Sequence, residues 1–296
     1  MSEKFPKVVC FGEILWDVFP THKVIGGAPL NVALRLHSFG IYTHIISSIG
    51  NDNNGKEALN YLNEAGLSTD MIQIDETHNT GYVNVFLDET GSATYQIFKP
   101  VAWDNIQLNR ENQNVVANTE IFIFGSLACR NEISKATLLS LISQAKYGVF
   151  DVNLRPPDFT MDLIIDLMRR SDFIKLNDEE LEQISDAMGF QNSTMEDQIK
   201  HLAEQTKTET ICVTRGGAGA LLYYESQFYS NSGYSVTVKD TVGAGDSFLA
   251  SMVLKLLIEK VNPEDALDFA CKVGALVASK EGANAEITKA DFESIT

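Results

Sequence analysis

The sequence contains few cysteines and few histidines, and neither residue is spaced as a metal site requires. The cysteines Cys10, Cys129, Cys212 and Cys271 lie far apart without a CxxC pair, and the five histidines form no HExxH pair. Three of the cysteines lie within apolar runs, which is typical of buried, reduced thiols in a cytoplasmic protein. The sequence therefore argues against a structural transition-metal site and predicts a cytoplasmic location.

Long hydrophobic runs and basic residues are also scarce. No segment approaches the roughly 20 apolar residues of a membrane span, and residues 1–7 contain no signal-peptide core. Only 23 Lys and Arg stand against 40 Asp and Glu, so the formal net charge is -17. Such an acidic chain disfavours nonspecific binding to nucleic acid or to an anionic membrane, and an anionic substrate would need local positive potential.

The length and the pattern of the chain indicate an α/β protein. A chain of 296 residues can form one large domain, or one domain with a small appendage. Short β-rich runs alternate with amphipathic segments, which predicts a parallel sheet with helices on both faces and ligands bound beyond the carboxyl ends of the strands. The predicted strands are 8–11, 43–46, 121–124, 149–152, 173–176 and 210–213, and the predicted helices are 29–39, 54–65, 134–145, 161–169, 178–188 and 195–206.

One stretch departs from this alternation. Residues 81–87 and 92–98 alternate in polarity around Asp88-Glu89-Thr90-Gly91, which is the pattern of an antiparallel hairpin. Because a two-stranded unit is not stable alone in water, we expect a small sheet that covers a substrate cleft or pairs with a second subunit. The alternative interpretation is a hairpin that extends the edge of the main sheet.

Residues 50–57, Gly-Asn-Asp-Asn-Asn-Gly-Lys-Glu, match the first seven positions of a phosphate-binding P-loop. The eighth position fails, because a P-loop needs Ser or Thr there to hold Mg²⁺, and Glu57 would repel the phosphates. A tight turn that enters a helix explains this segment better.

A turn of small residues followed by an acid, Asp240-Thr-Val-Gly-Ala-Gly-Asp246, precedes an amphipathic helix. The apolar spacing after Asp246 places Gly243, Ala244 and Gly245 at the N-terminal approach of this helix. The first helical turn has unpaired N–H groups and a partial positive charge, and small residues let a phosphate come close. Asp246 could then accept a hydroxyl proton, although capping of the helix explains the motif alone equally well.

A second region, Gly26-Gly-Ala-Pro-Leu-Asn31, reads as a glycine-rich helix entry. Its glycines permit close backbone approach, and Asn31 offers a donor and an acceptor that suit sugar hydroxyls. Together with residues 240–246, and with Gly40 and Gly50 further along, it resembles the paired signatures of the PfkB (ribokinase-like) carbohydrate kinases, with every spacing intact. The resemblance covers nearly the whole chain.

The resemblance implies a ribokinase-like three-layer α/β fold, with a central, mostly parallel sheet and a small β-sheet lid. It implies an α/β nucleotide- and substrate-binding domain formed by residues 1–11, 26–79 and 103–296, and a lid formed by 12–25 and 80–102. The implied activity is transfer of the γ-phosphate of ATP to a primary hydroxyl of a sugar. The implied cofactors are ATP and Mg²⁺, with K⁺ as a further candidate, and a homodimer through the lid stays open.

The block at 150–157, Phe-Asp-Val-Asn-Leu-Arg-Pro-Pro, is similar to the fructokinase-like branch of the family, and the segment 98–104 is compatible with it. Asp17 stands where the family places a substrate-binding aspartate, and an acidic ligand would be repelled there, which favours a neutral sugar. Fructose is the first choice, and another sugar or nucleoside, or a sugar-sensing protein without turnover, are the alternatives. Arg155 could hold a phosphate or pair with a surface carboxylate. The substrate-binding candidates are Asp17, Gly26, Gly27, Asn31, Phe98 and Asn153, and the catalytic candidates are Gly243, Ala244, Gly245, Asp246 and Arg155.

Two blocks match the nucleotide side of the family. Residues 175–180 look like the Asn-x-x-Glu element that organises the Mg²⁺ and phosphate region, and 214–219 look like the nucleotide-binding turn between two strands. The chain departs from the family at Cys271, where many relatives carry Asn or His near the adenine, and at Glu286, near a monovalent-cation loop. The nucleotide-binding candidates are Asn177, Glu180, Thr214, Gly216, Gly217, Gly219, Cys271 and Gly274, with Mg²⁺ near Asn177 and Glu180 and a monovalent cation near Asp240 and Gly282.

Overall fold

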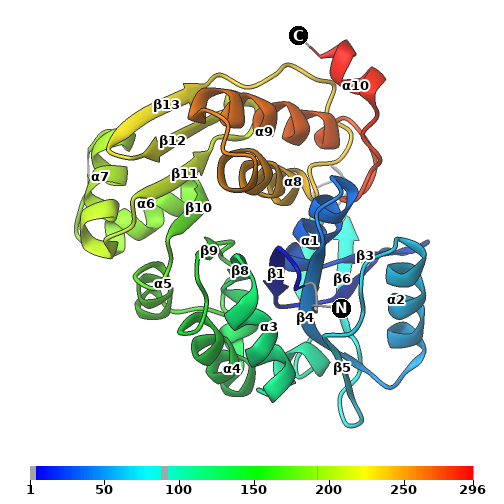
Figure 1. Ribbon diagram of the computed structural model, residues 1–296. Helices are drawn as coiled ribbons and strands as arrows, with labels where there is room; N and C mark the ends of the chain where they lie inside the picture. The colour runs from blue at the N-terminus through cyan, green and yellow to red at the C-terminus, as the bar shows by residue number, and fades with distance from the viewer. Residues whose placement is uncertain (1–4, 88–92, 192, 296) are drawn as a thin grey trace. The chain divides into compact units, whose positions relative to one another are not determined.

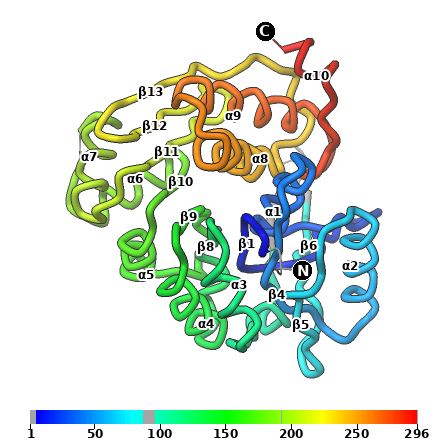
Figure 2. The backbone as a smooth tube through the Cα atoms, viewed as in Figure 1, coloured from blue at the N-terminus to red at the C-terminus, as the bar shows by residue number. Residues whose placement is uncertain are grey.

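The computed structural model describes residues 5–87, 93–191 and 193–295, so the predicted hairpin turn at 88–91, together with Ser92, lies outside the described residues. The strands form a nine-stranded sheet in the order β13-β12-β11-β10-β9-β8-β1-β4-β5 and a separate four-stranded sheet in the order β3-β2-β6-β7 (Figure 1). Strand and helix alternate along most of the chain, as the backbone trace in Figure 2 shows. The predicted α/β class, with a mostly parallel central sheet and a small second sheet, is confirmed.

The chain folds into two compact units. Unit 1 contains residues 1–122 and 127–146, and unit 2 contains residues 123–126 and 147–296. The predicted division into an α/β domain and a lid is a functional one and stays a prediction. The strands of the nine-stranded sheet are β1 (Val8–Phe11), β4 (Thr43–Gly50), β5 (Ile72–Asp75), β8 (Ile121–Gly125), β9 (Gly148–Asp151), β10 (Phe173–Asn177), β11 (Thr210–Thr214), β12 (Ala220–Tyr224) and β13 (Gln227–Asn231).

Buried parallel strands form the core of unit 1. Every residue of β1 and of β4 is buried, and β4 pairs in parallel with β1 on one side and with β5 on the other. Strands buried on both faces are continuous runs of mostly apolar residues, which is the pattern that the sequence shows. β4 continues past its predicted end because Ser47 and Ser48 are buried within it. The helices of unit 1 are α1 (Ala28–Ser38), α2 (Asn53–Glu64), α3 (Arg110–Asn118) and α4 (Glu132–Ile142).

The segment that resembles a P-loop is the capped start of α2. Asp52 is the N-cap residue, and its Oδ1 atom accepts hydrogen bonds from the Gly55 amide and the Thr80 hydroxyl, each at 2.7 Å. The Oδ2 atom accepts the Thr80 amide at 2.8 Å. A carboxylate, rather than a phosphate, therefore satisfies the start of this helix, and the predicted turn into a helix is confirmed.

The four-stranded sheet of unit 1, called the small sheet below, joins two hairpins. The first hairpin is β2 (Leu15–Val18) with β3 (Lys23–Gly26), and the second is β6 (Gly81–Leu87) with β7 (Ala93–Ile97). β2 and β6 pair in parallel and so connect the two hairpins. The predicted antiparallel hairpin is confirmed, and its interpretation as an edge extension of the main sheet is wrong.

The carboxyl ends of three parallel strands of unit 2 lie at the same edge of the sheet. β10 pairs in parallel with β9 and β11, and the register places Lys175 opposite Asp151 near the carboxyl ends of the strands. Ligands of open α/β sheets bind beyond this edge. The helices of unit 2 are α5 (Met161–Met168), α6 (Asp178–Ala187), α7 (Met195–Thr206), α8 (Ala244–Met252) with a π-helical continuation (Val253–Ile258), α9 (Pro263–Ala278) and α10 (Lys289–Ser294).

All four cysteines are buried and free, as expected. Within the described residues, no helix has both the length and the apolar character needed to cross a bilayer.

Candidate active site

The glycine-rich turn at 243–245 leads directly into α8. Gly243 is the N-cap residue with a left-handed backbone (φ 74°), and a Cβ atom there would collide with Ala283. Only glycine fits both constraints. The first intrahelical bond runs from the Ser247 amide to the Gly243 carbonyl at 2.8 Å, so the Gly245 and Asp246 amides precede the helical ladder. The turn therefore has the backbone geometry of an anion-binding helix start.

Asp246 is the third residue of α8, not its N-cap. Asp246 is buried, with an exposed fraction of only 8%. The alternative interpretation of Asp246 as the N-cap is therefore wrong, because Gly243 holds that position. A buried carboxylate in the first turn of a helix, directly after an anion-binding turn, is well placed to act as a base.

Lys175 lies behind the turn. Its Nζ atom is 2.9 Å from Asp151 Oδ1, and the two side chains are only 8% and 6% exposed. A Cβ atom added to Gly245 would lie 3.2 Å from the same Nζ, which puts the ammonium group directly behind this residue. Burial alone would lower the pKa of Lys175, but the carboxylates of Asp151, Glu180 and Asp246 outweigh it and raise the pKa. A charged lysine therefore lies among three acids close to the turn.

Asn177 and Glu180 form a capping box at the start of α6. The Asn177 side chain accepts the Glu180 amide at 2.8 Å, and Glu180 Oε2 accepts the Asn177 amide at 2.9 Å. Glu180 Oε1 accepts the amide of Leu154 at 2.8 Å, which fixes the loop after β9. Because both oxygens of Glu180 already accept amides, the residue fits a role in which it holds Mg²⁺ through bound water, as this ion often allows.

The loop after β9 holds the two candidates of the fructokinase-like block. Asn153 has a left-handed backbone (φ 46°), and its side-chain amide donates to Asp151 Oδ2 at 3.2 Å. Arg155 is exposed, and its Nη1 atom donates to the neighbouring Leu154 carbonyl at 3.1 Å. Asn153 therefore belongs to the Lys175 cluster, whereas the role of Arg155 stays a prediction.

The predicted nucleotide-binding turn lies between β11 and β12. Thr214 ends β11, and its hydroxyl donates to the Leu176 carbonyl at 3.4 Å. Added Cβ atoms on Gly216 and Gly217 would meet no other atom within 4 Å, so these backbones face open space. Gly219 is different, because a Cβ there would collide with the Asn231 carbonyl. Gly216 and Gly217 therefore fit a ligand contact, and Gly219 shapes the turn.

The two candidates on α9 differ in what surrounds them. Cys271 is buried, and burial raises the pKa of its thiol to about 12, so it is a neutral residue under ordinary conditions. A Cβ atom on Gly274 would lie 3.5 Å from the Ala244 carbonyl, which places α9 against the start of α8.

Asp240 and Gly282, the candidates for a cation site, are brought together by the fold. Asp240 Oδ2 accepts the Gly282 amide at 3.1 Å, and its Oδ1 accepts the Val242 amide at 3.0 Å. The ammonium of Lys280 donates to the Glu286 carbonyl at 2.7 Å in the same region. Lys280 therefore already contacts the carbonyl of Glu286, the residue at which the sequence departs from the ribokinases.

The sugar-side candidates lie in unit 1. A Cβ atom on Gly26 would lie 2.6 Å from Asp17 Oδ2, so the carboxylate covers this glycine. Gly27 is the N-cap of α1 (φ 116°), and a side chain there would collide with the Glu13 carbonyl. Glu13 Oε1 accepts the Ala28 amide at 3.2 Å, and Asn31, in the first turn of α1, is buried.

The register of the small sheet determines which face carries Asp17. Asp17 lies opposite Val24 and Val83, and Val83 lies opposite Ile97, so these four side chains form one row across the sheet. Neighbouring residues along a strand point to the other face. Trp16 therefore points away from Asp17, and its Nε1 donates to the Asn54 carbonyl of α2 at 3.0 Å. The face with Trp16 packs against α2, and the opposite face carries Asp17.

Phe98 directly follows β7 and lies beside Tyr82. Its ring stacks on Tyr82 with centroids 4.2 Å apart, and its amide donates to the Tyr82 carbonyl at 3.3 Å. Tyr82 lies opposite Trp16 in the register. Phe98 therefore stacks beside Tyr82, and its role in sugar binding stays a prediction.

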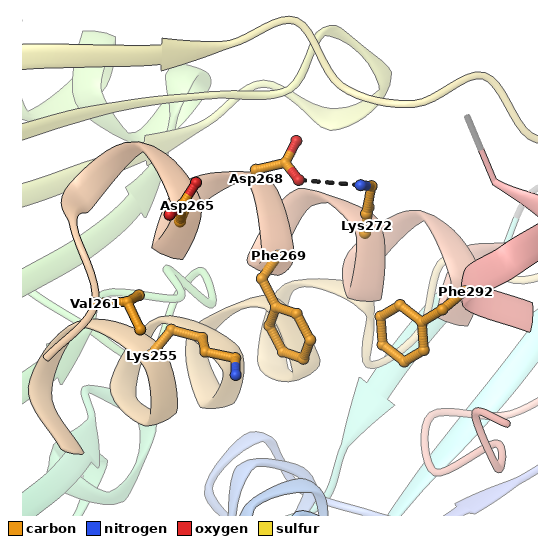
Figure 3. A pocket seen from close by; sticks show the side chains of 7 residues that line it. All are labelled: Lys255, Val261, Asp265, Asp268, Phe269, Lys272 and Phe292. Carbon is orange, nitrogen blue, oxygen red and sulfur yellow. Dashed lines mark ion pairs between the residues drawn. The ribbon is translucent and has the colours of Figure 1, made fainter. Parts of the chain in front are cut away.

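A hollow of about 350 Å³ in unit 2 does not coincide with these candidates (Figure 3). It lies along α9, where Phe269 stacks on Phe292 and Lys255 lies 4.6 Å from the Phe269 ring centroid. Lys272 pairs with Asp268 at 3.1 Å at its rim. Lys255 pairs with Glu259 outside the lining, and none of the seven lining residues is a predicted site residue.

Lys175 and Glu13 belong to the side-chain clusters described above, but the sequence predicted no functional role for either of them. A lysine inside the apolar strand Phe173–Asn177 is a signal, because a buried charge needs a partner. The same holds for Glu13, which is buried between the first two strands. The partners of both lie in other elements, so the sequence alone does not name them.

Comparison with known proteins supports one family over nearly the whole chain. The model of the pfkB family carbohydrate kinases matches residues 2–290. The Arabidopsis thaliana protein named "Probable fructokinase-6, chloroplastic" is 29% identical over 311 residues, covering 95% of this chain and 80% of that protein.

Solved structures agree with the fold. An uncharacterized sugar kinase from Pyrococcus horikoshii, in complex with ATP, has a TM-score of 0.84 at 26% identity and covers 96% of both chains. A fructokinase from Xylella fastidiosa with bound ATP has the same TM-score at 23% identity over 94% of both chains, which supports the fold alone. The ribokinase-like fold is confirmed, and the chain belongs to the PfkB family of carbohydrate kinases.

Proposed function

We propose that the protein phosphorylates the primary hydroxyl of a neutral sugar with ATP, and that fructose is its substrate. The observation that carries this proposal is the buried Asp246 in the first turn of α8, after a left-handed glycine and in front of a charged Lys175. The fructokinase-named relative supports the choice of fructose. The ATP complex of the Pyrococcus horikoshii protein supports the choice of nucleotide.

The residues of unit 2 fit the phosphoryl-transfer half of the reaction. When bound, MgATP supplies the phosphoryl group, and the metal ion neutralises charge on the phosphates. Asp246 would orient the sugar hydroxyl and accept its proton. The Gly245 and Asp246 amides would donate to the oxygens on which charge develops. The Ala244 amide is less available, because it already donates to the Thr241 carbonyl at 3.3 Å.

The residues of unit 1 fit the sugar half. Asp17 can accept hydrogen bonds from vicinal hydroxyls, and Asn31 can donate and accept. A carboxylate at this position would repel a sugar acid or a phosphosugar, because like charges destabilise each other. We therefore infer a neutral sugar.

Replacing Asp17 by alanine should raise the KM for the sugar by at least about tenfold, because each hydrogen bond to a charged acceptor contributes roughly 1.5–3 kcal/mol. The KM for ATP should change little. Steady-state kinetics with each substrate varied in turn checks this, and Asp17→Asn, which keeps the shape and removes the charge, should give a smaller effect. Equal increases in both KM values would show that Asp17 does not bind the sugar.

A coupled kinase assay over fructose, ribose, glucose, nucleosides and keto-deoxy sugar acids tests the substrate itself. We expect the highest kcat/KM with fructose. A preference for a sugar acid or a nucleoside would contradict the assignment of fructose. ATP turnover that no sugar stimulates, in a protein that binds sugar, would favour a sensing protein without catalysis.

The same assay in K⁺ and in a large organic cation tests activation at Asp240 and Gly282.

We propose that the small sheet acts as a lid over the sugar. Val83 and Val85 are buried on the face that carries Asp17, whereas Phe86 on the other face is 53% exposed. Sugar binding should slow hydrogen exchange of the amides in β6 and β7, because closure limits local opening. Exchange measured with saturating sugar and a nonhydrolysable ATP analogue checks this, and unchanged protection would contradict a lid. A homodimer through the same sheet stays a prediction, which sedimentation tests.

A further inference from the structure

Arg130 carries a deeply buried guanidinium group in unit 1. It ends a short 3₁₀ helix (Leu127–Arg130), and its side chain is 1% exposed. Its Nε and Nη2 atoms donate to the two carboxylate oxygens of Asp104 at 2.6 and 2.9 Å. Nη2 also donates to the Phe98 carbonyl at 2.6 Å, and the guanidinium lies 3.8 Å from the Trp103 ring centroid.

These contacts all reach the segment 98–104, which follows the last strand of the small sheet. Asp104 Oδ2 accepts the Val101 amide at 3.0 Å, so the acid bound by Arg130 also holds the middle of the segment. Trp103 is completely buried, and a Cβ atom on Gly81 would collide with its indole nitrogen. Arg130 is therefore connected to the end of β7 through Phe98 and to the start of β6 through Trp103.

Stability alone does not explain this arrangement. A buried ion pair is often no more stabilising than apolar residues of the same volume, because both charges lose their hydration. The planar guanidinium offers something that an apolar group lacks, namely several donors at fixed angles. Here these donors fix one carboxylate and one main-chain carbonyl at the same time. The contacts of Arg130 therefore fix the position of the main chain at Phe98.

The Phe98 carbonyl that Arg130 holds directly follows Ile97, the last residue of the row that carries Asp17. Ile97 precedes the anchored Phe98 carbonyl, and both side chains pack against a cluster of Val101, Trp103 and Leu127. Ile97 lies opposite Val83, which lies opposite Asp17. A displacement at Phe98 would therefore be transmitted through two strand pairs to Asp17.

We propose that Arg130 is a positioning residue for sugar binding, which fixes the end of β7 and thereby the row from Ile97 to Asp17. Arg130 does not touch the sugar in this proposal. The proposal rests on the proposed function to the extent that Asp17 binds the sugar. Arg130 would then affect substrate recognition although its side chain is not part of the row from Ile97 to Asp17.

The test compares Arg130→Met and Arg130→Lys with the wild-type enzyme. Arg130→Met keeps an unbranched apolar side chain and removes all donors, and Arg130→Lys keeps the charge and loses the fork. Val116→Ala is the control for destabilisation, because Val116 is completely buried in α3 of the same unit and lies outside the anchored segment. The KM for fructose, the KM for ATP, kcat and hydrogen exchange at 93–106 are measured for each variant.

We expect Arg130→Met to raise the KM for fructose by at least about tenfold and to leave the KM for ATP within about twofold, because small displacements of binding groups have effects of this size or larger. Exchange at 93–106 should be faster than in the wild type. Arg130→Lys should lie between the two, and Val116→Ala should keep both KM values.

Three results would overturn the proposal. The first is a fructose KM of Arg130→Met equal to that of Val116→Ala. The second is an equal rise in both KM values, which indicates a general structural role. The third is unchanged exchange at 93–106 in Arg130→Lys, which remains informative if Arg130→Met does not fold. A wild-type protein without sugar kinase activity would instead show that the proposed function itself has failed.

Discussion

Replacing Asp246 by asparagine should lower kcat by at least about 100-fold, because positioned acid–base groups commonly contribute that much. Asparagine has nearly the same shape and still accepts hydrogen bonds, so the fold should persist. Turnover measured at saturating fructose and ATP, with circular dichroism to confirm folding, checks this result. Asp246→Asn tests the base directly, because it removes the charge and leaves the start of α8 in place.

Asp265 provides a matched control for this substitution. It is the third residue of α9, as Asp246 is the third residue of α8, but it is exposed. Asp265→Asn removes a negative charge from the first turn of a helix, which changes stability by only about 0.3–1 kcal/mol. It should keep normal turnover. If Asp246→Asn keeps turnover as well, the carboxylate is no more than a favourable charge at a helix start.

Replacing Lys175 by methionine should lower the free energy of unfolding by about 3–5 kcal/mol, because removal of one partner leaves the other charge buried and uncompensated. Asp151 is that other charge, and Asn153 bonds to it. Turnover should also fall, because the Lys175 ammonium lies next to Gly245 and pairs with Asp151, to which Asn153 of the loop after β9 is bonded. Chemical denaturation of the two proteins, followed by circular dichroism, measures the change.

Arg170→Met is the matched control for Lys175→Met. Arg170 pairs with Asp166 at the same distance of 2.9 Å, but both side chains are more than 40% exposed. Exposed pairs contribute about 0–1 kcal/mol, so this variant should unfold close to the wild type. A Lys175→Met protein that is no less stable than Arg170→Met would show that the buried pair has little net effect.

Local sequence patterns were sufficient for one amphipathic helix and for strands that are continuous apolar runs. The helix at 195–206 has its predicted bounds, and the strands at 8–11 and 173–176 are present with at most one added residue. α3 (Arg110–Asn118) was not predicted, because it is rich in asparagine, which favours non-helical hydrogen bonds. Its start depends on the capping side chain of Asn109, which accepts the Asn112 amide at 2.8 Å.

The glycine-rich turn before α8 could be located from the sequence, but its surroundings could not. Small residues before an acid and an amphipathic helix are all local signals, so residues 243–246 were identified correctly as a helix start. Lys175 depends on the register between β9 and β10, which places it opposite Asp151. The stacking of Phe98 on Tyr82 likewise depends on the pairing of β6 with β7. Pairing between distant strands is the information that a single sequence lacks.

The small sheet has a consequence for protein engineering. Its two hairpins are separated in the chain by α1, β4, α2 and β5, and only the parallel pair of β2 and β6 joins them. A two-stranded hairpin alone is marginally stable in water. The sheet is therefore not a continuous cassette. A chimera that exchanges specificity with another family member must transplant 12–26 and 80–102 together, because either segment alone would leave a strand carrying Asp17 or its neighbour Val83 without its native partner.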